Sequence, residues 1–150
     1  PDQKQTLIDD PSKITVGVEE MLRWVSPIVN MNRTLTRDTE LHGEKLSEGD
    51  RVLLLYPAGN RDERAFDAPD TFDIERSPNR HVAFGGYGVH HCLGASLARL
   101  ELKILFEEVL SRMPDIHFAS EEPLKRRPNN FITGIEEFPV KFTPGKRSDA

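Results

Sequence analysis

Apolar residues recur at helical spacing in two long stretches of the chain. Between residues 13 and 25 they fall on one face, which predicts an amphipathic helix with Ser12 as its N-cap. The run Leu93–Leu110 carries apolar residues on two adjacent faces, which is typical of a helix buried in a core. Residues 1–10 read as the end of another helix. A narrow polar stripe on the 93–110 helix, expected to be solvated, consists of Arg99, Lys103 and Glu107.

Between these helices the pattern changes to short segments that predict strands. The segments are residues 31–38, residues 39–50 with the spacing of a hairpin, and residues 51–56. Further short strands are expected after Pro114, at residues 116–118, 131–135 and 140–142. We expect the last residues, 146–150, to form a disordered tail.

Composition excludes several classes of protein. With 37% hydrophobic and 30% charged residues, the 150-residue chain suits a globular protein, and its net charge of -5 argues against a nucleic-acid binder. No apolar run approaches the roughly 20 residues that cross a bilayer. A single cysteine excludes an intrachain disulfide framework and fits the reducing cytoplasm. Because the sequence opens at Pro1 in helical sequence, we interpret it as a C-terminal piece of a longer protein or as a processed chain.

That cysteine, Cys92, lies between a glycine-rich loop and the longest helical run. A thiol at a helix N-terminus favours the thiolate, which is the form that binds metals. Gly85, Gly86 and Gly88 allow the backbone to lie close against something flat or to adopt positive φ, and Gly94 leaves room for a large ligand. One thiolate is a poor zinc site but a good axial ligand for haem iron, because the porphyrin supplies four donors.

Other interpretations of these residues remain open at this point. A lone cysteine is more often a small buried hydrophobe than a ligand. The run from His90 to Cys92 resembles a metal cluster, although adjacent residues do not converge on one ion. A glycine-rich loop before a helix can also cradle phosphate, but the Lys-Ser/Thr pair of a P-loop is missing.

The segment from Phe84 to Arg99 resembles the haem-binding signature of the cytochrome P450 family. The usual pattern is Phe-x-x-Gly-x-x-x-Cys-x-Gly, often with His two residues before the Cys in bacterial members. The residues in register here are Gly88, His90, Cys92 and Gly94. Phe84 lies one residue further from the cysteine than usual, a variant similar to that of some actinobacterial sterol and lipid oxidisers. The resemblance covers about residues 1–143 and implies a cytochrome P450 fold, C-terminal part, mainly α with small antiparallel β-sheets (α+β).

Four further residues match positions of the same family. Glu20 and Arg23, three apart on one helical face, resemble the family's helix pair, and Arg76 falls where the third member of a buried structural triad lies. Arg33 matches the position that binds a haem propionate. Without the resemblance, Glu20 and Arg23 would be an ordinary surface pair, and the two remaining arginines would be solvated.

The resemblance implies haem b (iron protoporphyrin IX) as cofactor, with Cys92 as its metal ligand and catalytic residue. The residues expected to contact the haem are Cys92, His90, Arg33, Phe84, Gly85, Gly86, Gly88, Gly94 and Ala98. The residues expected to line a substrate pocket are Val29, Phe131 and Ile132. The alternative for the last two is the plain core of a strand.

The activity implied is that of a haem-thiolate monooxygenase in the cytoplasm, which inserts one oxygen atom from O2 into a hydrophobic substrate such as a sterol or lipid. Electrons would come from NAD(P)H through a ferredoxin reductase and a ferredoxin. Residues 1–150 would form the C-terminal haem-binding portion of one domain, without the family's upstream oxygen-activating helix, and we expect them to be inactive alone. The alternatives are a peroxide-using thiolate-haem oxygenase and a haem-free structural module that keeps the fold as a relic.

Overall fold

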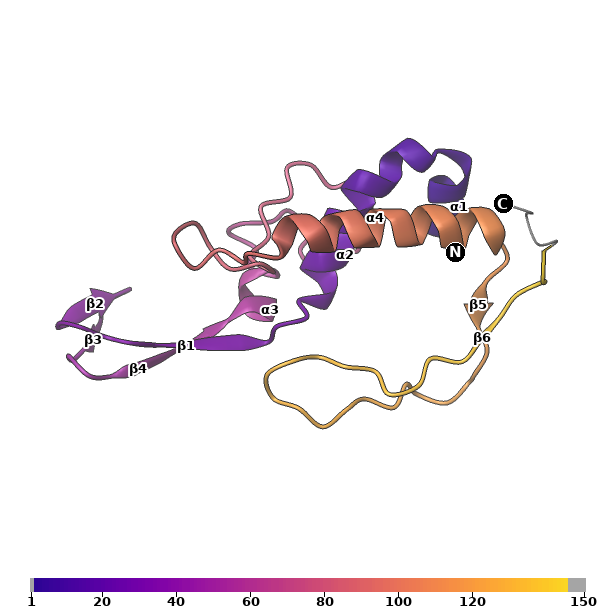
Figure 1. Cartoon of the computed structure of the whole chain (residues 1–150). Helices are drawn as coiled ribbons and strands as arrows, with labels where there is room; N and C mark the ends of the chain where they lie inside the picture. The colour runs from indigo at the N-terminus through magenta and orange to yellow at the C-terminus, as the bar shows by residue number, and fades with distance from the viewer. Residues whose placement is uncertain (1, 146–150) are drawn as a thin grey trace.

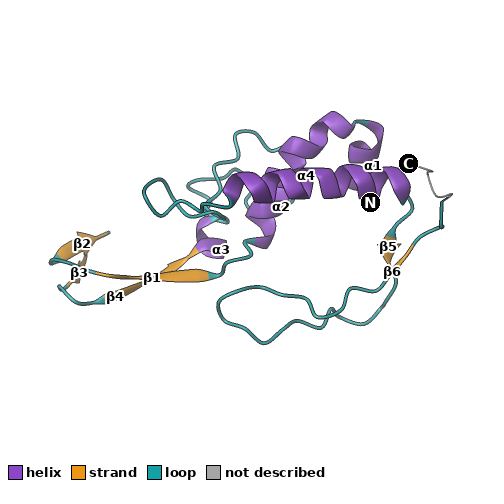
Figure 2. Ribbon diagram, viewed as in Figure 1, coloured by secondary structure: helices purple, strands orange, loops and turns teal. Residues whose placement is uncertain are grey.

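The computed structural model describes residues 2–145, which form a helical body with three two-stranded antiparallel sheets (Figures 1 and 2). The helices are α1 (Asp2–Asp9), the 3-10 helix η1 (Pro11–Lys13), α2 (Ile14–Val25), α3 (Tyr56–Gly59) and α4 (Ala95–Arg112). The strand pairs are β1 (Asn30–Thr34) with β4 (Arg51–Leu55), β2 (Thr39–Leu41) with β3 (Glu44–Leu46), and β5 (His117–Phe118) with β6 (Val140–Lys141). Figure 1 shows β1–β4 extending to one side of the helices. The predicted tail, residues 146–150, lies outside the described residues.

The three longer helices occur where the periodicity predicts them, with corrections at their N-terminal ends. Ser12 is not an N-cap, because the Asp10 side chain accepts the Ser12 N–H and caps η1 instead. Lys13 precedes α2 and makes no side-chain cap. The last helix begins at Ala95 rather than at residue 93, and Gly94 is its N-cap residue.

The hairpin prediction is confirmed, and two strand predictions need correction. Residues 42 and 43 connect β2 to β3 with positive φ of 52° and 87°, the twist that two-residue hairpin loops favour. Tyr56 begins α3 and is not part of β4. The strand expected at residues 131–135 is wrong, because this segment makes only isolated bridges, at Ile132 and Ile135, and no continuous ladder.

The apolar core lies between α1, α2 and the C-terminal end of α4. Its buried members are Leu7, Ile14, Val18, Leu22, Ile74, Ala83 and Leu110. The expectation that the last helix is buried on two faces is wrong for the described residues. Only Ala95 and Leu110 of α4 are buried, while Leu97 and Leu100 are 59% and 53% exposed. Residues 2–145 supply a layer against one side of α4 and no second layer over these side chains.

A charged cluster lies buried beside this apolar core. The side chains of Glu20 and Arg23 are fully buried, and that of Arg76 is 10% exposed. Arg23 donates from Nε and Nη2 to the two Glu20 oxygens at 2.7 and 2.8 Å, and Arg76 Nε donates to Oε2 at 3.2 Å. The sequence predicts that these three residues meet, and they do so in the folded chain. Arg76 is therefore not a solvated loop residue.

The cluster also fastens the irregular segment 60–79 to α2. Arg23 donates to the carbonyls of Asn60, Pro69 and Thr71 at 2.7–3.1 Å. Glu20 accepts the Asp73 N–H at 2.9 Å and the Asn79 side-chain N–H at 3.0 Å. Burial raises the pKa of Glu20, but the hydrogen bonds from Arg23 and Asp73 and the arginine charges outweigh it and lower the pKa below its usual range. Glu20 is therefore a carboxylate, and its two oxygens accept hydrogen bonds from five N–H groups.

We expect Glu20→Gln to lower the free energy of unfolding by about 3–5 kcal/mol, because it leaves the Arg23 guanidinium buried without a counter-charge. The measurement is denaturant unfolding of the full natural polypeptide that carries this sequence, followed by circular dichroism. The control is Glu107→Gln, which breaks a half-exposed pair with Lys103 and should cost about 0.5 kcal/mol. Equal losses in the two variants would contradict the assignment.

Candidate functional site

Cys92 lies at the end of a loop whose two ends are joined by backbone hydrogen bonds. Its N–H donates to the Phe84 carbonyl at 3.0 Å, and its own carbonyl accepts the Ala95 N–H at 3.2 Å, which leads the chain into α4. The Cys92 side chain is exposed. The alternative of a small buried hydrophobe is therefore wrong, and the sulfur is available to a ligand.

Two glycines of this loop are required by its backbone conformation. Gly85 and Gly88 have φ of 84° and 137°, which other residues rarely adopt. A Cβ placed on Gly86 or Gly88 would meet no atom within 4 Å, and one on Gly94 would lie 3.9 Å from the Cys92 sulfur. The space beside Gly86 and Gly88 is thus open among the described residues.

Apolar surface surrounds the exposed sulfur. Val89 and Leu93 are 97% and 101% exposed, which is costly for large aliphatic side chains in water. A cavity of about 350 Å³ opens next to them, between the end of α2, β1, α3 and the loop. Its lining residues are Leu22, Pro27, Ile28, Met31, Tyr56, Ala83, Phe84, Gly85, His90 and Cys92.

The donor set fits a haem better than a bare metal ion. Within residues 2–145, no group of three or more His, Cys, Asp or Glu side chains is arranged to hold a metal. The cluster reading of residues 90–92 is therefore not supported by the arrangement of the described side chains. A single exposed thiol beside an apolar cavity and a glycine-lined backbone matches a flat apolar macrocycle that brings four in-plane ligands of its own.

Only some of the other predicted haem contacts line this cavity. Phe84 and His90 line it, whereas Arg33 is exposed and donates to the neighbouring Asn32 carbonyl at 2.8 Å. Ala98 is half-buried in the first turn of α4, and its N–H donates to the Gly94 carbonyl. The structure therefore places some of the predicted haem residues at the cavity, while Arg33 is exposed two residues from the cavity-lining Met31, on the same face of β1.

The three predicted substrate-pocket residues are brought together, although about a hundred positions separate Val29 from Phe131 and Ile132. The Val29 N–H donates to the Phe131 carbonyl at 2.8 Å, and Ile28 forms a bridge with Ile132. Phe131 and Ile132 are 40% and 44% exposed, so the alternative of a plain strand core does not apply. They form an exposed apolar edge that the Ile132 bridge joins to the cavity-lining Ile28.

The sequence analysis missed a second ion-pair group, which joins α2, α4 and the segment before the Cys92 loop. Arg99, expected to be solvated, donates to Glu19 from Nε and Nη2 at 2.7 and 2.9 Å, and His81 Nε2 lies 3.0 Å from the same carboxylate. No local pattern joins residues 80 positions apart. The expectation for Arg99 is wrong because an α2 carboxylate lies opposite it. Lys103 and Glu107 stay partly exposed, as the stripe predicts, and they also pair with each other.

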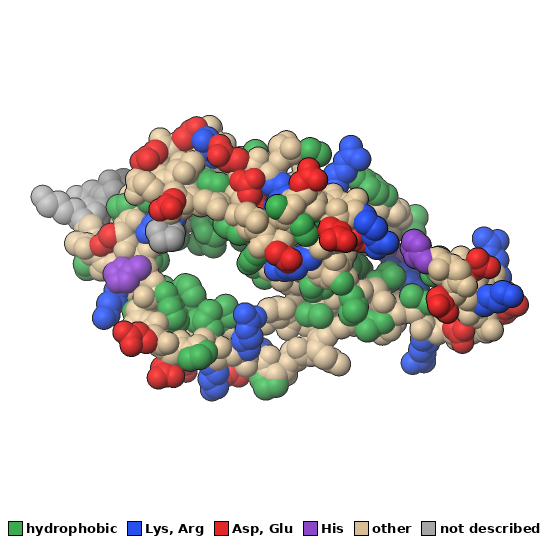
Figure 3. All heavy atoms as spheres, turned by 180° about the vertical axis from the view of Figure 1, so that it is seen from behind, with side chains coloured by type: hydrophobic (Ala, Val, Ile, Leu, Met, Phe, Trp, Pro, Cys, Tyr) green, Lys and Arg blue, Asp and Glu red, His purple; other side chains and the backbone are tan. Residues whose placement is uncertain are grey.

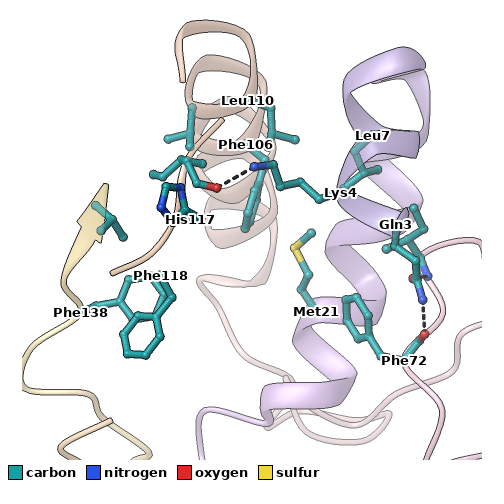
Figure 4. Close-up of a pocket in the computed structure, with 14 residues that line it drawn as sticks. Gln3, Lys4, Leu7, Met21, Phe72, Phe106, Leu110, His117, Phe118 and Phe138 are labelled. Carbon is teal, nitrogen blue, oxygen red and sulfur yellow. Dashed lines mark hydrogen bonds between the residues drawn. The ribbon is translucent and has the colours of Figure 1, made fainter. Parts of the chain in front are cut away.

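A second apolar cavity lies away from Cys92. It measures about 340 Å³ and is enclosed by α1, α2, α4 and the β5–β6 region, with Met21, Phe72 and Phe106 among its lining residues (Figure 4). Lys4 closes one edge by donating to the Ile116 carbonyl at 2.6 Å. It shares no lining residue with the cavity at Cys92. The two cavities are thus separate features of the described residues.

Within residues 2–145, no helix combines the length and the apolarity needed to span a membrane.

Comparison with known proteins gives the family. The chain matches the family model described as Cytochrome P450 over residues 15–142. It is 50% identical over 143 residues to a steroid C26-monooxygenase of Mycolicibacterium smegmatis, covering 95% of this chain and 35% of that protein. It is 52% identical over 127 residues to a methyl-branched lipid omega-hydroxylase of Mycobacterium bovis, covering 85% of this chain and 29% of that protein. The chain thus spans about a third of the length of the curated relatives it matches.

A solved structure agrees in both fold and sequence. P450BioI, crystallised with an acyl carrier protein carrying hexadec-9Z-enoic acid, matches with a TM-score of 0.91 and 42% identity over 95% of this chain and 37% of that one. The chain belongs to the cytochrome P450 family. Its architecture, helices with small antiparallel sheets, is part of that fold.

We expect Gly85→Ala to loosen the Cys92 loop, because its φ of 84° costs an L-residue about 1–2 kcal/mol. The measurement is hydrogen exchange at the Cys92 N–H, which should accelerate about tenfold as its bond to Phe84 opens more often. Gly86→Ala is the matched control, since Gly86 has no positive φ and open space around its Cβ position. Equal exchange rates in both variants would count against this account.

Proposed function

We propose that residues 1–150 are the C-terminal haem-binding portion of a cytochrome P450 monooxygenase that acts on a sterol or another long apolar substrate. The observation that carries the proposal is the exposed Cys92 sulfur, which lies on a glycine-lined loop beside an apolar cavity. The family and the fold support it. The chain spans about a third of the relatives' length, so the activity of the whole protein is part of the proposal.

Cys92 is proposed to hold the iron of haem b as a thiolate, and the loop backbone at Gly85, Gly86 and Gly88 to lie against the macrocycle. Bound haem supplies the reductive activation of O2 and the insertion of one oxygen atom into a C–H bond. Gly94 keeps side-chain atoms away from the sulfur, and Ala98 presents a small side chain one helical turn further on.

Two basic side chains are proposed to bind the haem propionates. His90 lines the cavity, from where its ring can donate a hydrogen bond to a carboxylate. Arg33 lies on β1, and among the described residues the only hydrogen bond of its side chain is to the Asn32 carbonyl, so guanidinium N–H groups remain for a propionate. Charge-assisted bonds of this kind would fix the orientation of the macrocycle.

The substrate class is proposed from the apolar edge formed by Val29, Phe131 and Ile132 and from what related proteins are named for. One relative is a steroid C26-monooxygenase, another a methyl-branched lipid omega-hydroxylase. Electrons are proposed to arrive from NAD(P)H through a ferredoxin reductase and a ferredoxin. A cytoplasmic location stays a prediction from the sequence.

We expect Cys92→Ser to abolish thiolate ligation of haem, because a neutral hydroxyl does not replace the thiolate as an iron ligand. The measurement is the carbon-monoxide difference spectrum of the reduced full natural polypeptide after loading with haem. The control is His91→Ala, which removes the adjacent exposed side chain and leaves the cavity lining intact. A thiolate-type spectrum in the Cys92→Ser protein would refute the proposal.

We expect the 150-residue polypeptide by itself to show no thiolate-type spectrum and no substrate oxidation. Cys92, Val89 and Leu93 of the loop are exposed, so water reaches a haem placed there. The same carbon-monoxide measurement on the isolated polypeptide tests this. A full complement of thiolate-ligated haem in that sample would show the prediction to be wrong.

A further inference from the structure

Three ionisable side chains meet behind the Cys92 loop, outside the proposed haem contacts. Arg99 on α4 grips the Glu19 carboxylate on α2 with two hydrogen bonds of 2.7 and 2.9 Å. His81, only 2% exposed, lies 3.0 Å from the same carboxylate and accepts the Ala83 N–H on its other ring nitrogen at 3.2 Å. The group, which we call the Glu19 clamp (Glu19, His81 and Arg99), joins two helices to the segment that leads into the loop.

The clamp holds a permanent charge pair in one orientation. Burial raises the pKa of Glu19, but hydrogen bonds from His81 and Arg99 outweigh burial and lower the pKa to about 2. Glu19 is therefore ionised at any physiological pH. Two parallel N–H bonds fix the plane of the guanidinium, which a lysine ammonium at the same position does not do.

The fixed guanidinium lies over the ring of Phe84. The Arg99 Cζ is 4.6 Å from the centre of that ring, and the centre of the His81 ring is 6.1 Å from it. A guanidinium within about 6 Å of an aromatic face is attracted to it by about 0.5–2 kcal/mol. Phe84 thus packs against two members of the clamp.

Phe84 is also the residue that anchors the loop. Its carbonyl accepts the Cys92 N–H at 3.0 Å, and the next residue, Gly85, donates to the Val82 carbonyl at 2.9 Å. Between these anchors the loop makes one other backbone hydrogen bond among the described residues, from His91 to Gly88. A displacement of Phe84 therefore moves the backbone that carries the sulfur.

We propose that Glu19, Arg99 and His81 are positioning residues for Cys92: they hold Phe84, and through its carbonyl they fix where the sulfur meets the haem iron. This inference rests on the proposed function, since it assigns the clamp a role in haem ligation. An ordinary surface ion pair would not have this effect. Lys103, one turn along α4, pairs with Glu107 at 2.9 Å and offers the comparison.

The test uses Arg99→Lys in the full natural polypeptide, which keeps the charge and removes the flat, two-bonded guanidinium. We expect hydrogen exchange at the Cys92 N–H to accelerate about tenfold and the thiolate-type share of the carbon-monoxide difference spectrum to fall. Lys103→Gln is the matched control on the same helix and should change neither. The Leu35 N–H, bonded to the Asp50 carbonyl in the distant hairpin region, reports general destabilisation and should exchange at an unchanged rate.

A second variant, Phe84→Leu, tests the route through the ring. It should reproduce the Arg99→Lys effects, and the double variant should be no worse than either single one. Unchanged Cys92 exchange in Arg99→Lys, additive effects in the double variant, or equal acceleration at Leu35 would each overturn the inference. If the unaltered protein lacks a thiolate-type spectrum, the proposed function fails, while the exchange comparison still decides whether the clamp positions the loop.

Discussion

One buried carboxylate organises the part of the chain that carries the site. Glu20 has no exposed surface and accepts hydrogen bonds from two arginines, a backbone N–H and an asparagine side chain. A buried charge of this kind is tolerated only when its donors are in place, so residues far along the chain must return to α2. The return of segment 60–79 also places buried Asn60, whose side chain accepts the Val82 N–H and so fixes the start of the loop.

The loop itself combines a firm base with an open face. Its base is formed by Phe84, by the backbone bond to Cys92 and by the Glu19 clamp. Its face consists of glycines and of fully exposed apolar side chains that have no cover within residues 2–145. Firm backbone and uncovered apolar surface together are what a ligand-binding loop requires, because the ligand can complete the packing without rearranging its support.

The same contrast holds for the molecule as a whole. Figure 3 shows hydrophobic side chains gathered around a hollow between the helical body and the C-terminal segment. Several leucines of α4 are also exposed, among them Leu97, Leu100 and Leu105. Since the chain spans about a third of the length of its curated relatives, its local structure agrees with the family while much of its apolar surface remains open.

The sequence by itself determined the helices, the β2–β3 hairpin and the family. Periodicity, glycine spacing and the cysteine signature reveal them, because each is a pattern among near neighbours in the chain. They also identified Glu20, Arg23 and Arg76, because the family pattern records a contact that the residues alone do not reveal. Tertiary structure decided the rest. It paired Arg99 with Glu19, left α4 half uncovered, and reduced the expected strand at 131–135 to single bridges. These outcomes depend on which distant segment arrives opposite a side chain, and no local pattern encodes that choice.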